Sequence, residues 1–94
     1  NLVDVDLLAL RLLEAIAVAH SNEATLTVTD AMSLNAIASP ATMHRKLNEL
    51  LDAGLIEQVY EGKNRRTKYL HPTTKASKYF DQMGNAIATA IQHA

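Results

Sequence analysis

Apolar residues recur every three or four positions along the first twenty residues of the chain. One set lies at Leu8, Leu12, Ala15, Ile16 and Ala19. The apolar stripe is widened by a second set at Val5, Ala9, Leu13 and Ala17. Residues 4–20 contain no Gly or Pro and consist mainly of strong helix formers, so the pattern predicts a helix. A stripe this broad indicates a helix that is central in the core or buries a face against another chain.

The following segment is shorter and less regular. Residues 21–23 form a polar break, and residues 26–28, Leu-Thr-Val, are a partly β-branched stretch that predicts a small strand. Thr29 or Asp30 then offers an N-cap, because their side-chain oxygens accept hydrogen bonds from the free amides of a first helical turn. A short second helix is predicted from there to about Asn35.

The third predicted helix has the clearest boundaries. Ser39 supplies an N-cap hydroxyl, and Pro40 takes the first helical position, where its missing N–H costs nothing. The helix is predicted to run to about Ala53 and to end at Gly54, which suits the left-handed position after a helix. Its apolar face consists of Met43, Leu47, Leu50 and Leu51, and its other faces carry Thr42, His44, Arg45, Lys46, Asn48 and Glu49.

The last part of the chain predicts a hairpin followed by a helix. Residues 55–60 alternate loosely as a strand, residues 61–66 form a polar turn, and residues 67–70 form the returning strand. Beyond Pro72 an amphipathic helix is predicted, with apolar positions at Ala76, Tyr79, Phe80, Met83, Ile87, Ala90 and Ile91. The predicted fold class is mainly α with a small β-hairpin, built as a three-helix core plus a C-terminal helix.

Composition narrows the class of protein. Ninety-four residues make a single domain, residues 1–94, and 48% of them are hydrophobic with few aromatics. The absence of cysteine excludes disulfides, thiolate metal ligands and cysteine nucleophiles, and fits a reducing compartment. No apolar run approaches the roughly 18 residues of a membrane span, and no basic region precedes the apolar start. We therefore expect a cytoplasmic protein that makes no membrane contact.

The net charge of −1 hides a segregation of charge along the chain. Residues 1–43 contain one basic residue against five acidic ones, whereas residues 44–78 contain eight basic residues against four acidic ones. A basic half of this kind can form one phosphate-facing surface on an otherwise acidic protein. The low net charge therefore does not exclude nucleic-acid binding.

Four short sequences carry a resemblance to a known family. They are Ser39-Pro40-Ala41-Thr42-Met43-His44-Arg45, Leu50-Leu51-Asp52-Ala53-Gly54-Leu55-Ile56, Asn64-Arg65-Arg66-Thr67-Lys68 and Thr73-Thr74-Lys75-Ala76. In their order and spacing, residues 26–80 resemble the winged helix-turn-helix core of MarR-type transcriptional regulators. The resemblance implies a helix-turn-helix at residues 29–53 and a hairpin wing at residues 55–71. It also implies a homodimer formed by the helices within residues 1–20 and 73–94. The apolar stripe of residues 79–91 could instead pack on the core of its own chain.

The first stretch of predicted DNA contacts is the helix of residues 39–53, which is expected in the major groove of duplex DNA. Ser39, Pro40 and Ala41 at its start allow a close approach to base edges, where the helix dipole also favours phosphate. The contacts expected at bases are Thr42, His44 and Arg45, with Arg45 able to bind guanine through two hydrogen bonds, and those expected at phosphates are Ser39 and Lys46.

The second stretch is the wing of residues 60–68, expected at the minor groove or the backbone. Arg65 and Arg66 at its tip can reach a minor groove, where negative potential is concentrated. The resemblance implies that Arg66 enters the groove and that Arg65 and Lys63 lie nearer the backbone. The remaining polar residues assigned to this contact are Asn64 and Lys68. From the residues alone, Arg45 and Lys46 could also form a solvated helix face, and the cations of the wing could also belong to a charged loop that keeps the hairpin soluble.

These features predict a homodimeric, sequence-specific regulator of transcription that binds double-stranded DNA. The alternative is a winged-helix module that contacts protein within a larger assembly. An enzyme or ligand-binding protein is a third possibility, although no catalytic motif is present and the four histidines do not have metal-ligand spacing. We expect no enzymatic activity, cofactor or metal. A pocket between the first and last helices could hold a small-molecule effector, which the sequence does not identify.

Overall fold

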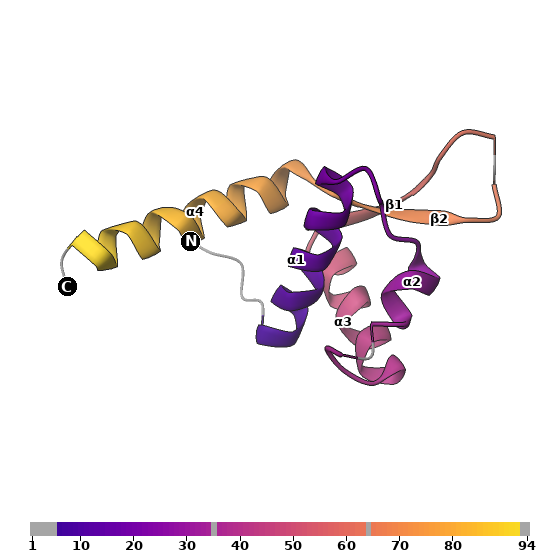
Figure 1. Cartoon of the computed structure of the whole chain (residues 1–94), viewed down its shortest axis with the longest axis horizontal. Helices are drawn as coiled ribbons and strands as arrows, with labels where there is room; N and C mark the ends of the chain where they lie inside the picture. Colours follow the sequence, from indigo (N-terminus) through magenta and orange to yellow (C-terminus); the bar gives the residue numbers. More distant parts are fainter. Residues whose placement is uncertain (1–5, 35, 64, 93–94) are drawn as a thin grey trace.

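The computed structural model describes residues 6–34, 36–63 and 65–92, with side chains as far as residue 82. This part of the chain is mainly helical and contains a two-stranded antiparallel sheet (Figure 1). In chain order the elements are α1 (Leu7–Ser21), α2 (Val28–Met32), α3 (Pro40–Asp52), β1 (Ile56–Tyr60), β2 (Lys68–Pro72) and α4 (Thr74–Gln92). The predicted fold class is therefore confirmed at the level of helices and one hairpin.

Helix α1 begins later than predicted. Asp6 has extended backbone angles and is the N-cap, and its carboxylate accepts a hydrogen bond of 2.8 Å from the amide of Ala9. Because an N-cap residue lies outside the helical conformation, α1 starts at Leu7. Asp4 and Val5, where the helix was predicted to begin, lie outside the described residues. The helix ends at Ser21, one residue after its predicted end.

The predicted strand at residues 26–28 is wrong, and so is the predicted N-cap of the second helix. Thr27 forms only an isolated bridge with Tyr69, and Val28 already belongs to α2. The Thr27 hydroxyl accepts from the amide of Asp30, and the Asp30 carboxylate accepts from the amide of Thr27, each at 3.0 Å. This capping box satisfies two free amides at once, which favours a helix start at this point over a strand. The helix ends at Met32, short of the predicted Asn35.

Helix α3 forms as predicted, with Ser39 as N-cap and Pro40 in the first turn. At its end, Gly54 has a φ of +74° and its amide donates to Leu51 O, while the amide of Leu55 donates to Leu50 O. These two bonds are the Schellman pattern that a glycine after a helix permits. The chain is thereby turned from α3 directly into the hairpin.

The hairpin is longer on its second strand than predicted. β1 pairs with β2 from Ile56 opposite Pro72 to Tyr60 opposite Lys68. Thr67 lies before the paired region, and the strand continues two residues past Leu70. The extra pairing is compatible with Pro72 because a proline at the end of an edge strand removes no ladder hydrogen bond that the sheet requires.

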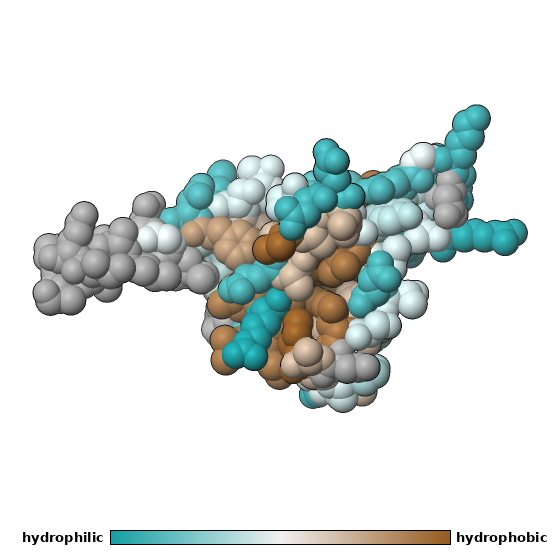
Figure 2. Space-filling view, in the orientation of Figure 1, coloured by the Kyte–Doolittle hydropathy of each residue, from teal (hydrophilic) through white to brown (hydrophobic). Residues whose placement is uncertain are grey.

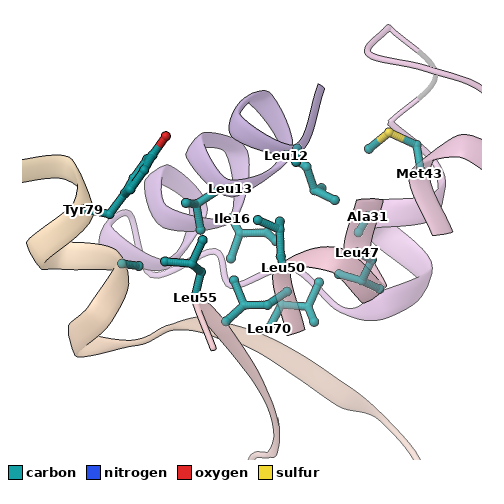
Figure 3. Close-up of a cluster of buried hydrophobic side chains, with 13 residues drawn as sticks. Leu12, Leu13, Ile16, Ala31, Met43, Leu47, Leu50, Leu55, Leu70 and Tyr79 are labelled. Carbon is teal, nitrogen blue, oxygen red and sulfur yellow. The ribbon is translucent and has the colours of Figure 1, made fainter. Parts of the chain in front are cut away.

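The core is centred on α1, in agreement with its two apolar sets. Leu12, Leu13 and Ile16 of α1 are fully buried, and α1 packs against both α3 and β2. Figure 3 shows their side chains meeting those of the other elements. The buried residues from the rest of the fold are Ala31, Met43, Leu47, Leu50, Leu55, Ile56, Leu70, Ala76 and Tyr79.

Helix α4 docks on the end of α3 with its first turn. Thr73, just before the helix, donates from its hydroxyl to Gly54 O at 2.7 Å, and the Lys75 ammonium donates to Ala53 O at 2.5 Å. These bonds satisfy carbonyls that the end of α3 leaves without helical partners. Ala76 and Tyr79 then enter the core, and Phe80 packs edge-on to Tyr79.

Beyond this contact α4 extends away from the body, on the side opposite the hairpin loop (Figure 1). The molecule is accordingly elongated, with extents of 49 × 28 × 23 Å and a radius of gyration of 14.2 Å. A compact domain of this length would have a radius of about 12 Å. In the described part of the chain, no helix combines the length and apolar character needed to cross a membrane.

Candidate nucleic-acid interface

Helix α3 separates an apolar buried face from a polar exposed face. Met43, Leu47 and Leu50 are buried against the core. The opposite positions are polar or small and lie open to solvent. Of the predicted contact residues on this helix, those that are exposed are Pro40, Ala41, His44 and Arg45, whereas Thr42 is half-buried. The helix start is therefore accessible to a large partner.

The polar side chains at the start of α3 bind one another. Ser39 is exposed; its hydroxyl accepts from the amide of Thr42 at 3.4 Å and donates to the Thr42 hydroxyl at 3.2 Å. The Arg45 guanidinium makes a long contact of 3.5 Å to the same Thr42 hydroxyl. One turn later, the His44 ring lies 3.4 Å from the Asn48 amide nitrogen. These contacts are long and exposed, and both Arg45 and His44 remain accessible to solvent.

Lys46 has a different environment from Arg45. Its ammonium lies 2.5 Å from the Asp6 carboxylate and 3.3 Å from Glu49, and its side chain is only 14% exposed. The hydrogen bond from Lys46, followed by that from the Ala9 amide, lowers the pKa of Asp6. The bond to Asp6 likewise raises the pKa of Lys46. Lys46 thus joins α3 to the start of α1 and is paired with two carboxylates. Its contact with phosphate stays a prediction.

The sequence could not show this pairing because the two partners are separated by 40 positions. Helical spacing reveals only the nearer one, Glu49, three residues away on the same helix. Asp6 comes within reach because α1 packs across α3, which depends on tertiary structure.

The hairpin loop, residues 61–67, carries most of the remaining predicted contacts. Lys63, Arg65 and Arg66 are exposed, as is Lys68 at the start of β2, and Asn64 lies outside the described residues. Figure 2 shows hydrophilic side chains projecting at this end of the molecule. The guanidinium carbon of Arg65 lies 5.7 Å from the centre of the Tyr60 ring, within the range of a cation–π contact.

A notch between α2 and the hairpin brings together residues that sequence reasoning missed. It is lined by Thr27, Val28, Thr29 and Asp30 from one side and by Gln58, Arg66, Thr67 and Lys68 from the other. Thr29 and Gln58 were not predicted as contacts because nothing in their local sequence marks them. Their proximity results from the backbone bond of 2.8 Å between the Leu70 amide and Leu26 O, which fastens the start of α2 to β2.

A second, shallow groove lies between α1 and α4. Its lining is Glu14, Ala17, Val18, Ser21 and Phe80. Val18 is 57% exposed, and Leu7 on the same helix is 62% exposed. Figure 2 shows hydrophobic residues at the surface of the face on which α1 lies in front. The groove lies where the sequence predicted a dimer contact or an effector pocket.

Two of the described histidines, His20 and His71, lie close to one another. His71 on β2 lies 2.7 Å from Glu61, and its ring centre is 4.6 Å from that of His20. Within residues 6–34, 36–63 and 65–92, no group of three or more potential ligands has a geometry that could hold a metal ion.

The chain was compared with models of known protein families, with curated proteins and with solved structures. None of the three comparisons found a match.

Proposed function

We propose that the protein is a regulator of transcription that binds double-stranded DNA through a winged helix-turn-helix. In this proposal α2 and α3 form the helix-turn-helix, and β1, β2 and the hairpin loop form the wing. The observation that carries the proposal is the division of α3, which buries its apolar face and exposes Arg45 and His44 at its start. The hairpin loop also exposes cations, which would provide a second positively charged contact with DNA.

Helix α3 would insert its N-terminal half into the major groove. Arg45 carries a planar set of donors that matches the two acceptors of guanine, and Thr42 and His44 lie beside it. Ser39 would bind phosphate together with the helix dipole. Lys63, Arg65, Arg66 and Lys68 would neutralise further phosphates, so affinity should fall steeply as salt rises.

The protein would act as a homodimer through α1 and α4. Support comes from the length of α4, which extends past the body of its own chain (Figure 1), and from the exposed apolar residues Leu7 and Val18 on α1. The sequence continues the apolar stripe of α4 through Met83, Ile87 and Ile91. A two-fold dimer would place two copies of α3 in successive major grooves of a palindromic site.

An electrophoretic shift assay on selected duplexes tests the proposal. Sites are first enriched from a random pool, and Arg45→Ala is then compared with Lys78→Ala. Lys78 is a suitable control because it is an exposed cation that lies outside both the proposed DNA contacts and the apolar stripe of α4. We expect Arg45→Ala to lose sequence preference and Lys78→Ala to retain it. Equal behaviour of the two variants, or no enrichment of any site, would contradict the proposal.

A protein-interaction module is the second candidate, favoured by the exposed Leu7 and Val18 and by the net charge of −1. In that case the apolar surface of α1 would be the functional one. The two candidates separate at low salt, because a duplex-binding protein retains nonspecific affinity at about 50 mM salt. A chain that shifts no duplex there, and whose Val18→Asp variant changes its assembly, would favour the second candidate.

A further inference from the structure

The hairpin loop holds its two arginines in different surroundings. Tyr60 is the last residue of β1, its side chain is 38% exposed, and Arg65 lies over its ring. Arg66, the next residue, lines the notch beside α2 together with Lys68. Adjacent residues in the sequence thus face different parts of the molecule.

The contact with Tyr60 has a specific consequence for Arg65. A guanidinium group that stacks on an aromatic ring uses its flat face, whereas its N–H donors point outward in the plane. The ring therefore restricts the side chain without occupying its hydrogen-bond donors. An arginine that is oriented before binding loses less conformational freedom when it enters a groove.

The position of Arg66 suits a different task. The notch offers the Thr29 hydroxyl and the Gln58 amide next to the two cations Arg66 and Lys68. These groups are donors suited to the oxygens of a phosphodiester.

We infer that Tyr60 is a positioning residue for Arg65 and that this pair enters the minor groove, while Arg66 and Lys68 hold the DNA backbone. The inference rests on the proposed function and reverses the roles that the sequence resemblance implies for the two arginines. Arg65 then supplies the sequence preference of the wing, because narrow A·T-rich minor grooves attract arginine most strongly.

The first test uses the free protein, without DNA. Protons above an aromatic ring are shifted upfield in an NMR spectrum, so the side-chain signals of Arg65 report the stacking directly. We expect an upfield shift in the wild type and in Tyr60→Phe, which keeps the ring, and its loss in Tyr60→Leu. The side-chain signals of Arg66 should be the same in the wild type and in both variants. An Arg65 signal that is insensitive to Tyr60→Leu would overturn the inference.

The second test compares duplexes that differ only under the wing, with A·T, G·C or inosine·C pairs. Inosine lacks the minor-groove amino group of guanine, so it separates groove shape and access from major-groove contacts. We expect Arg65→Ala to abolish the preference for A·T and inosine·C, and Tyr60→Leu to reduce it about two- to fivefold. Tyr60→Phe should retain it. Arg66→Ala should weaken binding to all three duplexes by the same factor.

The outcomes distinguish this inference from the proposed function. Loss of the preference in Arg66→Ala with Arg65→Ala unchanged overturns the inference but leaves DNA binding intact. Equal preference in Tyr60→Leu and the wild type overturns the positioning role of Tyr60. Failure of the wild type to bind any duplex overturns the proposed function, and with it the assignment of both arginines.

Discussion

The start of α3 and the hairpin loop both expose cations, but the body of the protein fixes them to different degrees. At α3, packing of three buried side chains, an N-cap and a Schellman turn set the helix in place. At the loop, the side chain of Arg65 is held by contact with one ring.

A second comparison concerns Arg45 and Lys46, which are neighbours in the sequence. Arg45 is exposed, whereas Lys46 is paired with Asp6 and Glu49. The charge available to a partner is therefore smaller than the charge in the sequence.

The largest expected effect comes from removing the packing that fixes α3. Leu47 is 2% exposed, and Leu47→Ala should lower the free energy of unfolding by about 2–5 kcal/mol, because it leaves a cavity between α3 and the core. Leu47→Met keeps the volume and should cost less than about 1.5 kcal/mol. Urea denaturation followed by circular dichroism measures both. Similar losses for the two variants would show that α3 is not held by close packing.

The next effect concerns the exposed cation of α3. Arg45→Ala should reduce discrimination between the preferred site and a variant site by about 1–3 kcal/mol, the cost of one lost two-bond contact to a base. Lys46→Met should change discrimination much less, because the ammonium of Lys46 is already paired. Competition titrations at fixed salt measure the ratio. A larger loss in Lys46→Met than in Arg45→Ala would invert the comparison.

A smaller effect is expected from removing the N-cap of α2. The start of α2 also lines the notch beside the hairpin loop. Thr27→Ala removes the capping hydroxyl and should cost about 1 kcal/mol. Thr29→Ala is the matched control, because Thr29 is exposed in the first turn and is not the cap. Thermal denaturation of the two variants gives the difference. A greater loss in Thr29→Ala would mean that the helix starts where the sequence had suggested.

The smallest expected effect concerns the ion pair between Asp6 and Lys46, which joins α1 to α3 and should contribute less to stability at acid pH. The pKa of Asp6 is lowered from 3.8 in the folded state, so its charge stabilises the fold above that value, and this contribution is lost as the pH falls through the lowered pKa. Asp6→Asn should therefore flatten the decline in melting temperature as the pH falls below about 4. An unchanged decline would show that the ion pair with Lys46 contributes nothing measurable.

The boundaries of α3 and the start of α2 both depend on neighbouring residues, but only the first were predicted correctly. Ser39, Pro40 and Gly54 determine the boundaries of α3 through short-range hydrogen bonds, and these boundaries were predicted correctly. The start of α2 was misplaced because Thr27 competes for two roles, a strand residue and a cap, and only the capping box with Asp30 decides between them. Both outcomes involve contacts within three or four positions.

The candidate interface was harder to predict because its geometry depends on distant contacts. The exposure of His44 and Arg45 follows from the helical period, whereas the pairing of Lys46 depends on a residue 40 positions away. Likewise, the notch of Thr29, Gln58, Arg66 and Lys68 exists only because β2 is bonded to the segment before α2. Residue types alone therefore identified candidate cations but could not assign a role to each of them.

The central claim is that the start of α3 and the hairpin loop bind one duplex together. An NMR titration of the wild-type protein with an enriched duplex tests it most directly, since amide signals report contact along the chain. We predict that amides of residues 41–46 and of the hairpin loop shift together at the same DNA concentration, while those of Ala17 and Val18 on α1 do not. Shifts confined to α1, or to only one of the two basic stretches, would contradict the account.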